Sequence, residues 1–435
     1  VKLPEELSIF TKKTISNKKM LLKEIAKIRT QGFSRDDEEY AKGIRCVARP
    51  VFDETHRVIA AIGIAVLVMR LFDAIQDPFI GHYSDTLNPY RKHIIALGVA
   101  CFTLGFLMLF NPLAAAPLAW LCVSFVLCTF GFSVVTINMQ ALGSLWQVPS
   151  ASFTTVMATR EGFSLIGVLL AASLPPVLEK FYDTKEAFTY YSLAIIPLVI
   201  IGTGLFYKWL SHAKLDDSKA VSLKVGALFE QKISKYFFGV YFLNSVASAI
   251  PATLLVFFVR DYLKAEPYLG MFLAIYFLAG AAAMPLWQKL SKSKSKIYAW
   301  GGSMVLATAT FIWTIFIPEK AIVAFSIICA LSGMAVGANL ALPTAIAADL
   351  IRDRKHQSAS NRYYAAMTFF YKSSLAVAAG LVLPSLEFLG FEPNTQNGVE
   401  LLPYAYALVP CVLLVLTIAL WARLVALEAP INKKD

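Results

Sequence analysis

Three charged side chains, Arg70, Asp73 and Asp77, lie within the otherwise apolar stretch RLFDAIQDPFIG. At the 100° per residue of an α-helix, offsets of three, four and seven residues place all three on one face. An isolated charge at the centre of a bilayer costs about 2.5–3.5 kcal/mol on insertion scales, so such residues usually pair or bind a ligand. One arginine cannot neutralise two carboxylates, and the remaining negative charge suits a cation held by oxygen ligands. A static Arg–Asp pair that stabilises a helix bundle is the alternative.

The elements that must position these charges are membrane-spanning helices. The 435-residue chain is 57% hydrophobic and 16% charged, whereas a soluble domain carries about 25% charged residues. Apolar runs of about 20 residues, long enough to cross a bilayer, recur along most of the chain. The eleven predicted spans lie near 60–81, 93–111, 117–138, 153–177, 187–209, 237–259, 268–288, 297–317, 321–345, 363–388 and 403–424. The expected fold class is an all-α polytopic membrane protein, located in the plasma membrane.

The net charge of +11 is distributed unevenly over the connections between these spans. Lys and Arg gather in alternate connections, at Arg91, Lys92, Lys208, Lys214, Lys219, Lys224, Lys232, Lys235, Lys289, Lys292, Lys294, Lys296, Arg352, Arg354, Lys355, Arg362, Lys433 and Lys434. The connections NPLAAAP and GFEPNTQNGVELLP contain neither residue. The positive-inside rule assigns the basic connections to the cytoplasm. The charge therefore orients the protein in the lipid bilayer and requires no nucleic-acid partner.

The long polar stretch 210–236 predicts a cytoplasmic linker between two membrane halves. A weak internal echo supports this division, because 77–98 and 284–302 each run from an apolar helix through Pro and a short basic turn into the next helix. Parallel halves of this kind are a transporter architecture. The predicted parts are an N-terminal fragment (1–64), an N-terminal membrane half (65–209), a cytoplasmic linker (210–236), a C-terminal membrane half (237–425) and a cytoplasmic tail (426–435).

The first 57 residues are polar and predict a soluble segment. Leu21, Leu22, Ile25 and Ile28 have helical spacing, and IRCVARPVFDETHRVIAAIGIAV predicts a strand, a turn and a second strand. The stretches TISNKKMLLKEIAKIRTQGFSRDDEEY, GIRCVARPVFD and VIAAIGIA resemble the effector-binding domain of IclR-type transcription regulators. The resemblance implies a small α/β fragment that lacks the DNA-binding helix-turn-helix and the first part of the effector domain.

The pattern Asp, three residues, Asp-Pro, two residues, Gly in RLFDAIQDPFIG resembles the second helix of the glycoside–pentoside–hexuronide:cation symporters. These form the melibiose-permease-like branch of the major facilitator superfamily, and the resemblance extends over about 66–425. In that family both aspartates belong to the coupling-cation site. The resemblance therefore implies that Asp73 and Asp77 bind Na⁺ or H⁺.

The segment GHYSD, followed by Arg91 and Lys92, resembles the basic cytoplasmic turn between helices two and three of the superfamily. The resemblance implies that Gly81 permits a tight exit from the helix and that Asp85 takes part in a charge lock that gates the cytoplasmic side. A merely solvated turn is the alternative for these residues.

Arg160 in VMATREGFSL and Lys372 in MTFFYKSSLAVAAG stand where the family carries a substrate-contacting arginine and a characteristic lysine. Snorkelling to the membrane interface is the alternative for both. Asn138 in VVTINMQALG is a departure, because the family has an acidic residue near cation and sugar there. The Asn138 carbonyl can ligate Na⁺ but cannot take up a proton, so we expect it to assist cation and substrate binding and leave the coupling ion open.

The family has twelve helices, and its first, which carries a sugar-binding acidic residue, has no counterpart here; the IclR-like piece stands in its place. The expected function is cation-coupled symport of a sugar, glycoside or hexuronide by a monomer. The chain is not expected to be an enzyme, since it has no nucleophile–base arrangement, and no metal cluster or cofactor is expected beyond the coupling ion. A non-functional fusion or gene-model product and a membrane-bound metabolite sensor are the alternatives.

Overall fold

The computed structural model describes residues 15–31, 34–37, 45–52, 58–113, 117–147, 150–215, 228–353, 359–391 and 397–428. The chain divides into two compact units, Val1–Phe72 and Asp73–Asp435. The predicted boundary between the N-terminal fragment and the membrane part lies at 64/65, eight residues before this division.

Among its described residues, the first unit contains helix α1, the beginning of α2 and an antiparallel three-stranded sheet in the order β1-β2-β3. Its elements are α1 (Lys18–Gln31), β1 (Ser34–Asp37), β2 (Arg45–Phe52) and β3 (Val58–Gly63). The helix and the two strands expected from the sequence are confirmed, the turn expected between these strands lies outside the described residues, and the polar strand β1 was not predicted. Leu21, Ile25 and Ile28 are partly buried, but Leu22 is exposed, so the apolar face of α1 is narrower than its spacing indicates.

Helix α2 (Ile64–Thr86) carries the charged motif and begins in the first unit. The predicted span 60–81 is wrong at both ends. Its first four residues belong to β3, because they pair with β2 from Ala60↔Val51 to Gly63↔Ala48. The helix continues past Gly81 and ends at Thr86, shortly before Pro89. A proline disfavours helical backbone in the residue before it.

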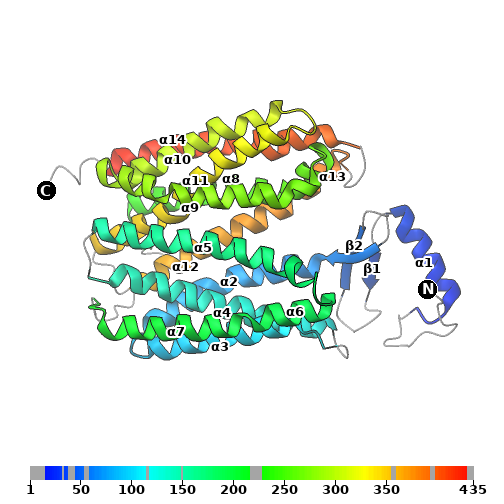
Figure 1. Ribbon diagram of the computed structural model, residues 1–435, viewed down its shortest axis with the longest axis horizontal. Coiled ribbons are helices and arrows are strands. Elements are labelled where there is room, and N and C mark those ends of the chain that lie inside the picture. Colours follow the sequence, from blue (N-terminus) through cyan, green and yellow to red (C-terminus); the bar gives the residue numbers. More distant parts are fainter. Residues whose placement is uncertain are drawn as a thin grey trace. The chain divides into compact units, whose positions relative to one another are not determined.

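The remaining spans are confirmed as helices, some with short 3₁₀ or π segments at their ends. In the N-terminal half they are α3 (Arg91–Phe110), α4 (Pro117–Leu145), α5 (Ser150–Leu178), α6 (Thr184–Leu193) and α7 (Ile195–His212). In the C-terminal half they are α8 (Lys232–Phe257), α9 (Leu269–Ser293), α10 (Lys296–Phe311), α11 (Ile322–Asp353), α12 (Ser360–Val377), α13 (Leu383–Phe388) and α14 (Val409–Glu428). Figure 1 labels these elements.

Ten helical stretches within the described residues are long and apolar enough to cross a membrane. Two of them combine consecutive helices, α6 with α7 and α12 with α13. Helix α2 corresponds to the first of the eleven predicted spans and is the one that is not among these ten. It carries four charged residues, Arg70, Asp73, Asp77 and Asp85. The protein is an all-α polytopic membrane protein in its second unit.

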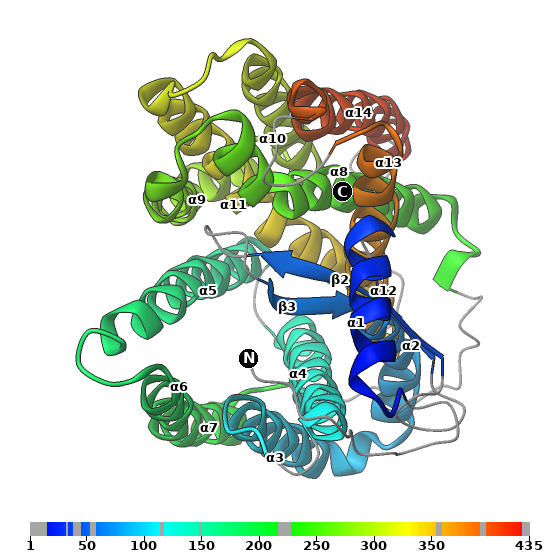
Figure 2. The same ribbon diagram turned by 90° about the vertical axis from the view of Figure 1, so that its right-hand side faces the viewer.

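The two membrane halves differ in how well their helices are covered. In Figure 2 the helices α3 to α7 lie in the lower part of the view, and α8 to α11 with α14 lie in the upper part. In the most apolar 18-residue stretch of α8 and the π segment after it, half of the residues are buried, whereas none is buried in the corresponding stretch of α6 and α7. Added Cβ atoms at Gly167, Gly202 and Gly204 would meet nothing within 4 Å.

This difference follows from the order of the helices. Counted from the linker, α8 is the first helix of the C-terminal half, and it packs against the fifth and the last, α12 and α14. In the N-terminal half α5 and α7 hold the corresponding places, and the described residues include no helix that packs between them as α8 does. Among the described residues, the apolar side chains of α5 and α7 are therefore less covered than those of α8.

Candidate functional site

Asp73 and Asp77 lie one turn apart on α2, so their side chains project from the same face of the helix. The Asp77 side chain is fully buried, and the Asp73 side chain is 17% exposed. A carboxylate this deep in a membrane protein needs a partner. The face common to both residues turns toward α4 and α12, where that partner is found.

The partner is Lys372, which projects from α12 in the other half of the membrane part. Its Nζ donates to Asp73 Oδ1 at 2.7 Å and to Asp77 Oδ1 at 3.0 Å. It also lies 2.6 Å from Ser133 Oγ on α4 and 3.1 Å from the Asp73 carbonyl oxygen. Only 10% of the Lys372 side chain is exposed. The sequence placed Lys372 with the substrate, but the structure places its ammonium between the two carboxylates.

One ammonium does not balance two carboxylates, so these three side chains carry a net charge of −1 when all are ionised. The second carboxylate oxygen of Asp77, Oδ2, is buried and has no hydrogen-bond partner among the described residues. Such an oxygen is a ready ligand for a small cation or a site for a proton. The Arg70 side chain lies outside the described residues, so the Arg–Asp pairing considered from the sequence has no structural counterpart to compare.

Asn138 on α4 is buried, but the hydrogen bonds of its side chain go to residues other than Asp73, Asp77 and Lys372. Its Nδ2 donates to Ser84 Oγ at 3.0 Å and to the Val134 carbonyl at 2.9 Å. Ser84 is seven residues beyond Asp77 on α2, about two turns toward the end of that helix. The Asn138 Oδ1 atom is buried without a partner among the described residues.

Arg160 on α5 forms an ion pair with its neighbour Glu161, whose Oε1 accepts from both Nε and Nη2. The side chains are 33% and 14% exposed. Sequence reasoning singled out Arg160 and missed Glu161. The signal was present, since an acidic residue directly after an arginine in an apolar span calls for the same explanation as Asp73 and Asp77.

Asp85, at the end of α2, caps the beginning of α12. Its carboxylate accepts from the backbone N–H groups of Asn361 and Arg362, both at 3.1 Å, and from Asn361 Nδ2 at 2.9 Å. The Arg362 Nε atom lies 3.7 Å from Asp85 Oδ2. The backbone N–H groups of the first turn and the helix dipole both favour a carboxylate at this position. The acid of one half thus binds the helix start of the other.

Gly81 lies in the middle of this contact rather than at a turn, so the expected tight exit is wrong. An added Cβ would come within 2.5 Å of the Ala365 Cβ and 2.9 Å of the Asn361 carbonyl oxygen. Glycine is needed here because α2 and α12 approach so closely that no side chain fits between them. The chain leaves the helix later, through the 3₁₀ turn Asn88–Tyr90.

Arg91 and Lys92 open α3 on the far side of that turn. The Arg91 side chain is largely buried, whereas Lys92 is exposed. The Lys92 carbonyl accepts a 2.8 Å hydrogen bond from the Tyr207 hydroxyl of α7. These two residues therefore anchor the connection between α2 and α3.

A second contact between the halves mirrors the first and was not predicted. Arg352, at the end of α11, donates from Nε to the Ser144 carbonyl at 3.0 Å and from Nη2 to the Trp146 carbonyl at 2.6 Å. Its guanidinium lies over the Phe153 ring, 5.2 Å from the centroid. A cation favours the last carbonyls of a helix, here those of α4. Both contacts lie at the end that carries the basic connections, and together they join the two halves there.

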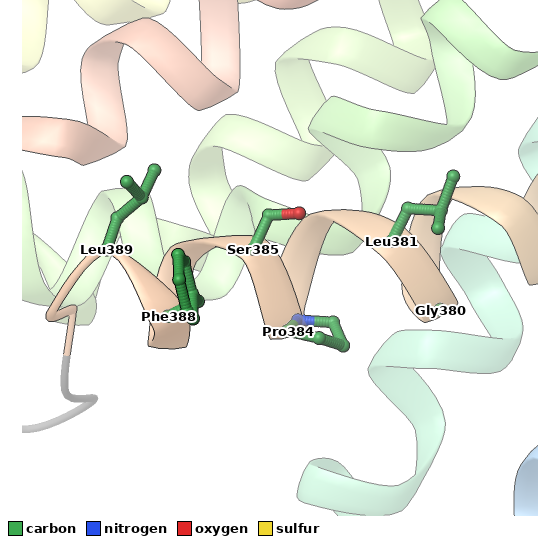
Figure 3. A pocket seen from close by; sticks show the side chains of 6 residues that line it. All are labelled: Gly380, Leu381, Pro384, Ser385, Phe388 and Leu389. Atoms are coloured by element: carbon green, nitrogen blue, oxygen red, sulfur yellow. The ribbon is translucent and has the colours of Figure 1, made fainter.

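A hollow of about 440 Å³ lies along α13 and the π segment Ala378–Val382 that precedes it, and Figure 3 shows the side chains around it. It is lined by Gly380, Leu381, Pro384, Ser385, Phe388 and Leu389. The lining is almost entirely apolar and includes none of the charged residues described above. This hollow is therefore separate from the candidate site.

The N-terminal part of the chain is similar to transcription regulators. Residues 3–86 match the family model of the bacterial transcriptional regulator IclR C-terminal domain. The HTH-type transcriptional regulator XynR of Escherichia coli is 39% identical over 69 residues, which are 16% of this chain and 27% of that regulator. The chain thus spans about a quarter of the length of the regulator it matches, and the expected resemblance to a regulator fragment is confirmed.

The membrane part is similar to transporters. The uncharacterized symporter YnaJ of Bacillus subtilis is 23% identical over 396 residues, 82% of each chain. A bacterial homologue of the iron transporter ferroportin, in an outward-facing state, has a TM-score of 0.65 at 13% identity over 83% of this chain and 89% of its own. The fucose:proton symporter FucP of Escherichia coli has a TM-score of 0.61 at 12% identity over 83% of this chain and 90% of its own. At such identities the two structures show the fold alone.

The model of one transporter family covers most of the chain, residues 57–427. Its match begins just before the charged motif of α2 and ends in α14, so it includes every residue of the candidate site. The chain belongs to the MFS/sugar transport protein family.

Proposed function

We propose that the protein is a secondary active transporter that couples Na⁺ or H⁺ to the symport of a sugar, glycoside or hexuronide. The family description, the similarity to a symporter and the fold shared with a fucose:proton symporter support this proposal. The observation that carries it is the position of the Lys372 ammonium, which holds two carboxylates of the opposite half.

This arrangement offers a coupling device. Asp73 and Asp77 belong to α2 and Lys372 belongs to α12, so the ion pairs join the two halves that alternating access must move. A cation that binds between the carboxylates supplies the charge that Lys372 supplies now. Lys372 is then free to turn toward a substrate, and its ordering by that substrate favours retention of the cation. Reciprocal coupling of two ligands requires such a shared group.

Substrate binding falls to Arg160 and Lys372 in this proposal. Sugar hydroxyls both donate and accept hydrogen bonds, and the fork of an arginine can contact vicinal hydroxyls or a carboxylate with two N–H groups. Arg160 belongs to the N-terminal half and Lys372 to the C-terminal half, so a substrate that contacts both lies between the halves. No cofactor is proposed besides the coupling ion, and no covalent chemistry.

Asn138 assists from α4 through its buried carbonyl oxygen. An amide oxygen is a normal ligand for Na⁺ and cannot be protonated at physiological pH. Proton coupling would therefore use Asp73 or Asp77 and not Asn138.

The substrate class is tested by the binding of candidate glycosides and uronates to the purified chain and to Arg160→Ala. We expect at least one sugar to bind the wild type and to lose about tenfold or more in affinity in the variant, since hydrogen bonds to a charged group are worth about 1.5–3 kcal/mol. Arg423→Ala, on the exposed side of α14, is the control and should bind like the wild type. Equal affinity in Arg160→Ala would remove Arg160 from the site, and binding of no sugar by the wild type would overturn the substrate class.

A further inference from the structure

Glu161 is a third acidic side chain of the membrane-spanning part, on α5 and apart from the two carboxylates of α2. Its side chain is only 14% exposed, whereas Phe163 and Leu170 on the same helix are 70% and 65% exposed. Helix α5 therefore turns Glu161 toward the protein and the two apolar residues toward lipid.

Helix α5, which carries Glu161, packs against α9 and α11 of the opposite half. The Glu161 carboxylate is also near enough to the phenol groups of Tyr371 on α12 and Tyr241 on α8 for an electrostatic interaction. Tyr371 directly precedes Lys372, which holds the carboxylates of α2. Glu161 thus lies on the surface between the halves, where a transporter of this architecture binds its substrate.

The ion pair with Glu161 uses the edge of the Arg160 guanidinium that recognises anions. Its Nε donates to Glu161 Oε1 at 3.1 Å, and its Nη2 donates to the same oxygen. Adjacent residues on a helix point about 100° apart, so both side chains must bend to meet. This Nε and Nη2 edge is one that a substrate carboxylate would use for a two-point contact. Glu161 already occupies it.

We propose that Glu161 determines substrate class, by holding Arg160 in an ion pair that accepts uncharged glycosides and rejects glycosides bearing a carboxylate. Arginine offers donors only and glutamate offers acceptors only, so the pair presents both partners that a hydroxyl group needs. A uronate would have to displace Glu161 from Arg160 and would leave the Glu161 charge without its partner in a partly buried site. This inference rests on the proposed sugar transport and narrows its substrate.

The test compares matched neutral and anionic sugars on the purified full-length chain. Methyl glucoside with methyl glucuronide, and methyl galactoside with methyl galacturonide, differ only at the carboxylate. Titration calorimetry gives the ratio of the two affinities for wild type and for Glu161→Gln. We expect the wild type to prefer the neutral sugar, and Glu161→Gln to shift that ratio by about tenfold or more toward the uronide, because an unpaired arginine then meets the carboxylate.

Two further variants guard this result. Glu179→Gln removes the same charge at the exposed end of α5 and should leave the ratio unchanged. Glu161→Asp keeps the charge and should keep the preference for the neutral sugar. If Glu161→Gln does not fold, as judged by size-exclusion chromatography and thermal unfolding in detergent, Glu161→Ala replaces it in the same comparison.

The outcomes separate this inference from the function on which it rests. Binding of a sugar to the wild type, with the same affinity ratio in Glu161→Gln, would overturn the role of Glu161 and leave sugar transport standing. A wild type that prefers the uronide would do the same. Binding of neither member of any pair to the wild type would overturn the proposed function and this inference with it.

Discussion

The Lys372 ammonium lies 3.0 Å from Asp77, a fully buried carboxylate 295 positions earlier in the chain and in the opposite membrane half. The contact joins α12 to α2, and no more than 10% of either side chain is exposed. Removing one partner therefore leaves the other as a buried ion that lacks this pairing.

Lys372→Met should lower the free energy of unfolding by roughly 3–5 kcal/mol, because breaking a buried ion pair strands the partner charge. A cation that binds the two carboxylates should restore more stability to this variant than to the wild type. Thermal unfolding in detergent, with sodium chloride or choline chloride and at acidic or neutral pH, measures both effects. Lys264→Met is the control, since Lys264 pairs with the 54% exposed Glu319 and should contribute no more than about 1 kcal/mol. Equal losses in the two variants would contradict the assignment.

Gly81→Ala should destabilise the contact between α2 and α12. The new Cβ would lie 2.5 Å from the Ala365 Cβ, and overpacking of this kind costs about 1–3 kcal/mol. Thermal unfolding again provides the measurement. Gly302→Ala on α10 is a matched change with room, because its nearest atom would be 3.9 Å away; it should be neutral or slightly stabilising. A Gly81→Ala variant as stable as Gly302→Ala would show that the helices do not approach this closely.

Asp85→Asn should loosen the contact between the halves at the end that carries the basic connections. The amide loses the charge that favours the first turn of α12 and the ion pair with Arg362, so the open form becomes more populated. A cysteine at the buried position Ser144, in a chain without its other cysteines, should then react faster with a maleimide.

The matched control for this change is Asp183→Asn, which removes the charge of an exposed helix cap that lies outside the contacts between the halves. It should leave the labelling rate unchanged. Arg352→Gln should raise the rate as Asp85→Asn does, because Arg352 makes the second contact at that end. Labelling at the wild-type rate in both gate variants would remove these contacts from the gate.

The sequence was sufficient for the membrane helices, because hydropathy is a local property of about 20 consecutive residues. It was insufficient at their ends, where pairing of β3 with β2 and the position of Pro89 decide. The role of Gly81 could not be read from the sequence either. The residues that follow Gly81 favoured a turn at the end of the helix. Glycine is needed there because the backbone of α12 lies so close, and α12 begins about 280 residues later in the chain.

The candidate site, too, could be predicted from the sequence only in part. The spacing of Asp73 and Asp77 on one helix was visible in the sequence, since four residues make one turn. The partner that balances them was not, because the contact with Lys372 depends on how two halves of the fold meet. The roles of Glu161 and Arg352 could not be predicted either, because they depend on contacts that the structure shows. Glu161 pairs with Arg160, and Arg352 binds the end of α4.

The central claim, that Asp77 belongs to a cation site coupled to sugar binding, is tested most directly by the linkage between the two ligands. Sugar affinity of the purified chain is measured in sodium chloride and in choline chloride, each at acidic and neutral pH, for wild type and Asp77→Asn. We predict that Na⁺ or protons tighten sugar binding to the wild type by about fivefold or more, a typical coupling between linked sites, and that Asp77→Asn binds sugar without responding to either. An Asp77→Asn protein that keeps the full cation response would contradict the account.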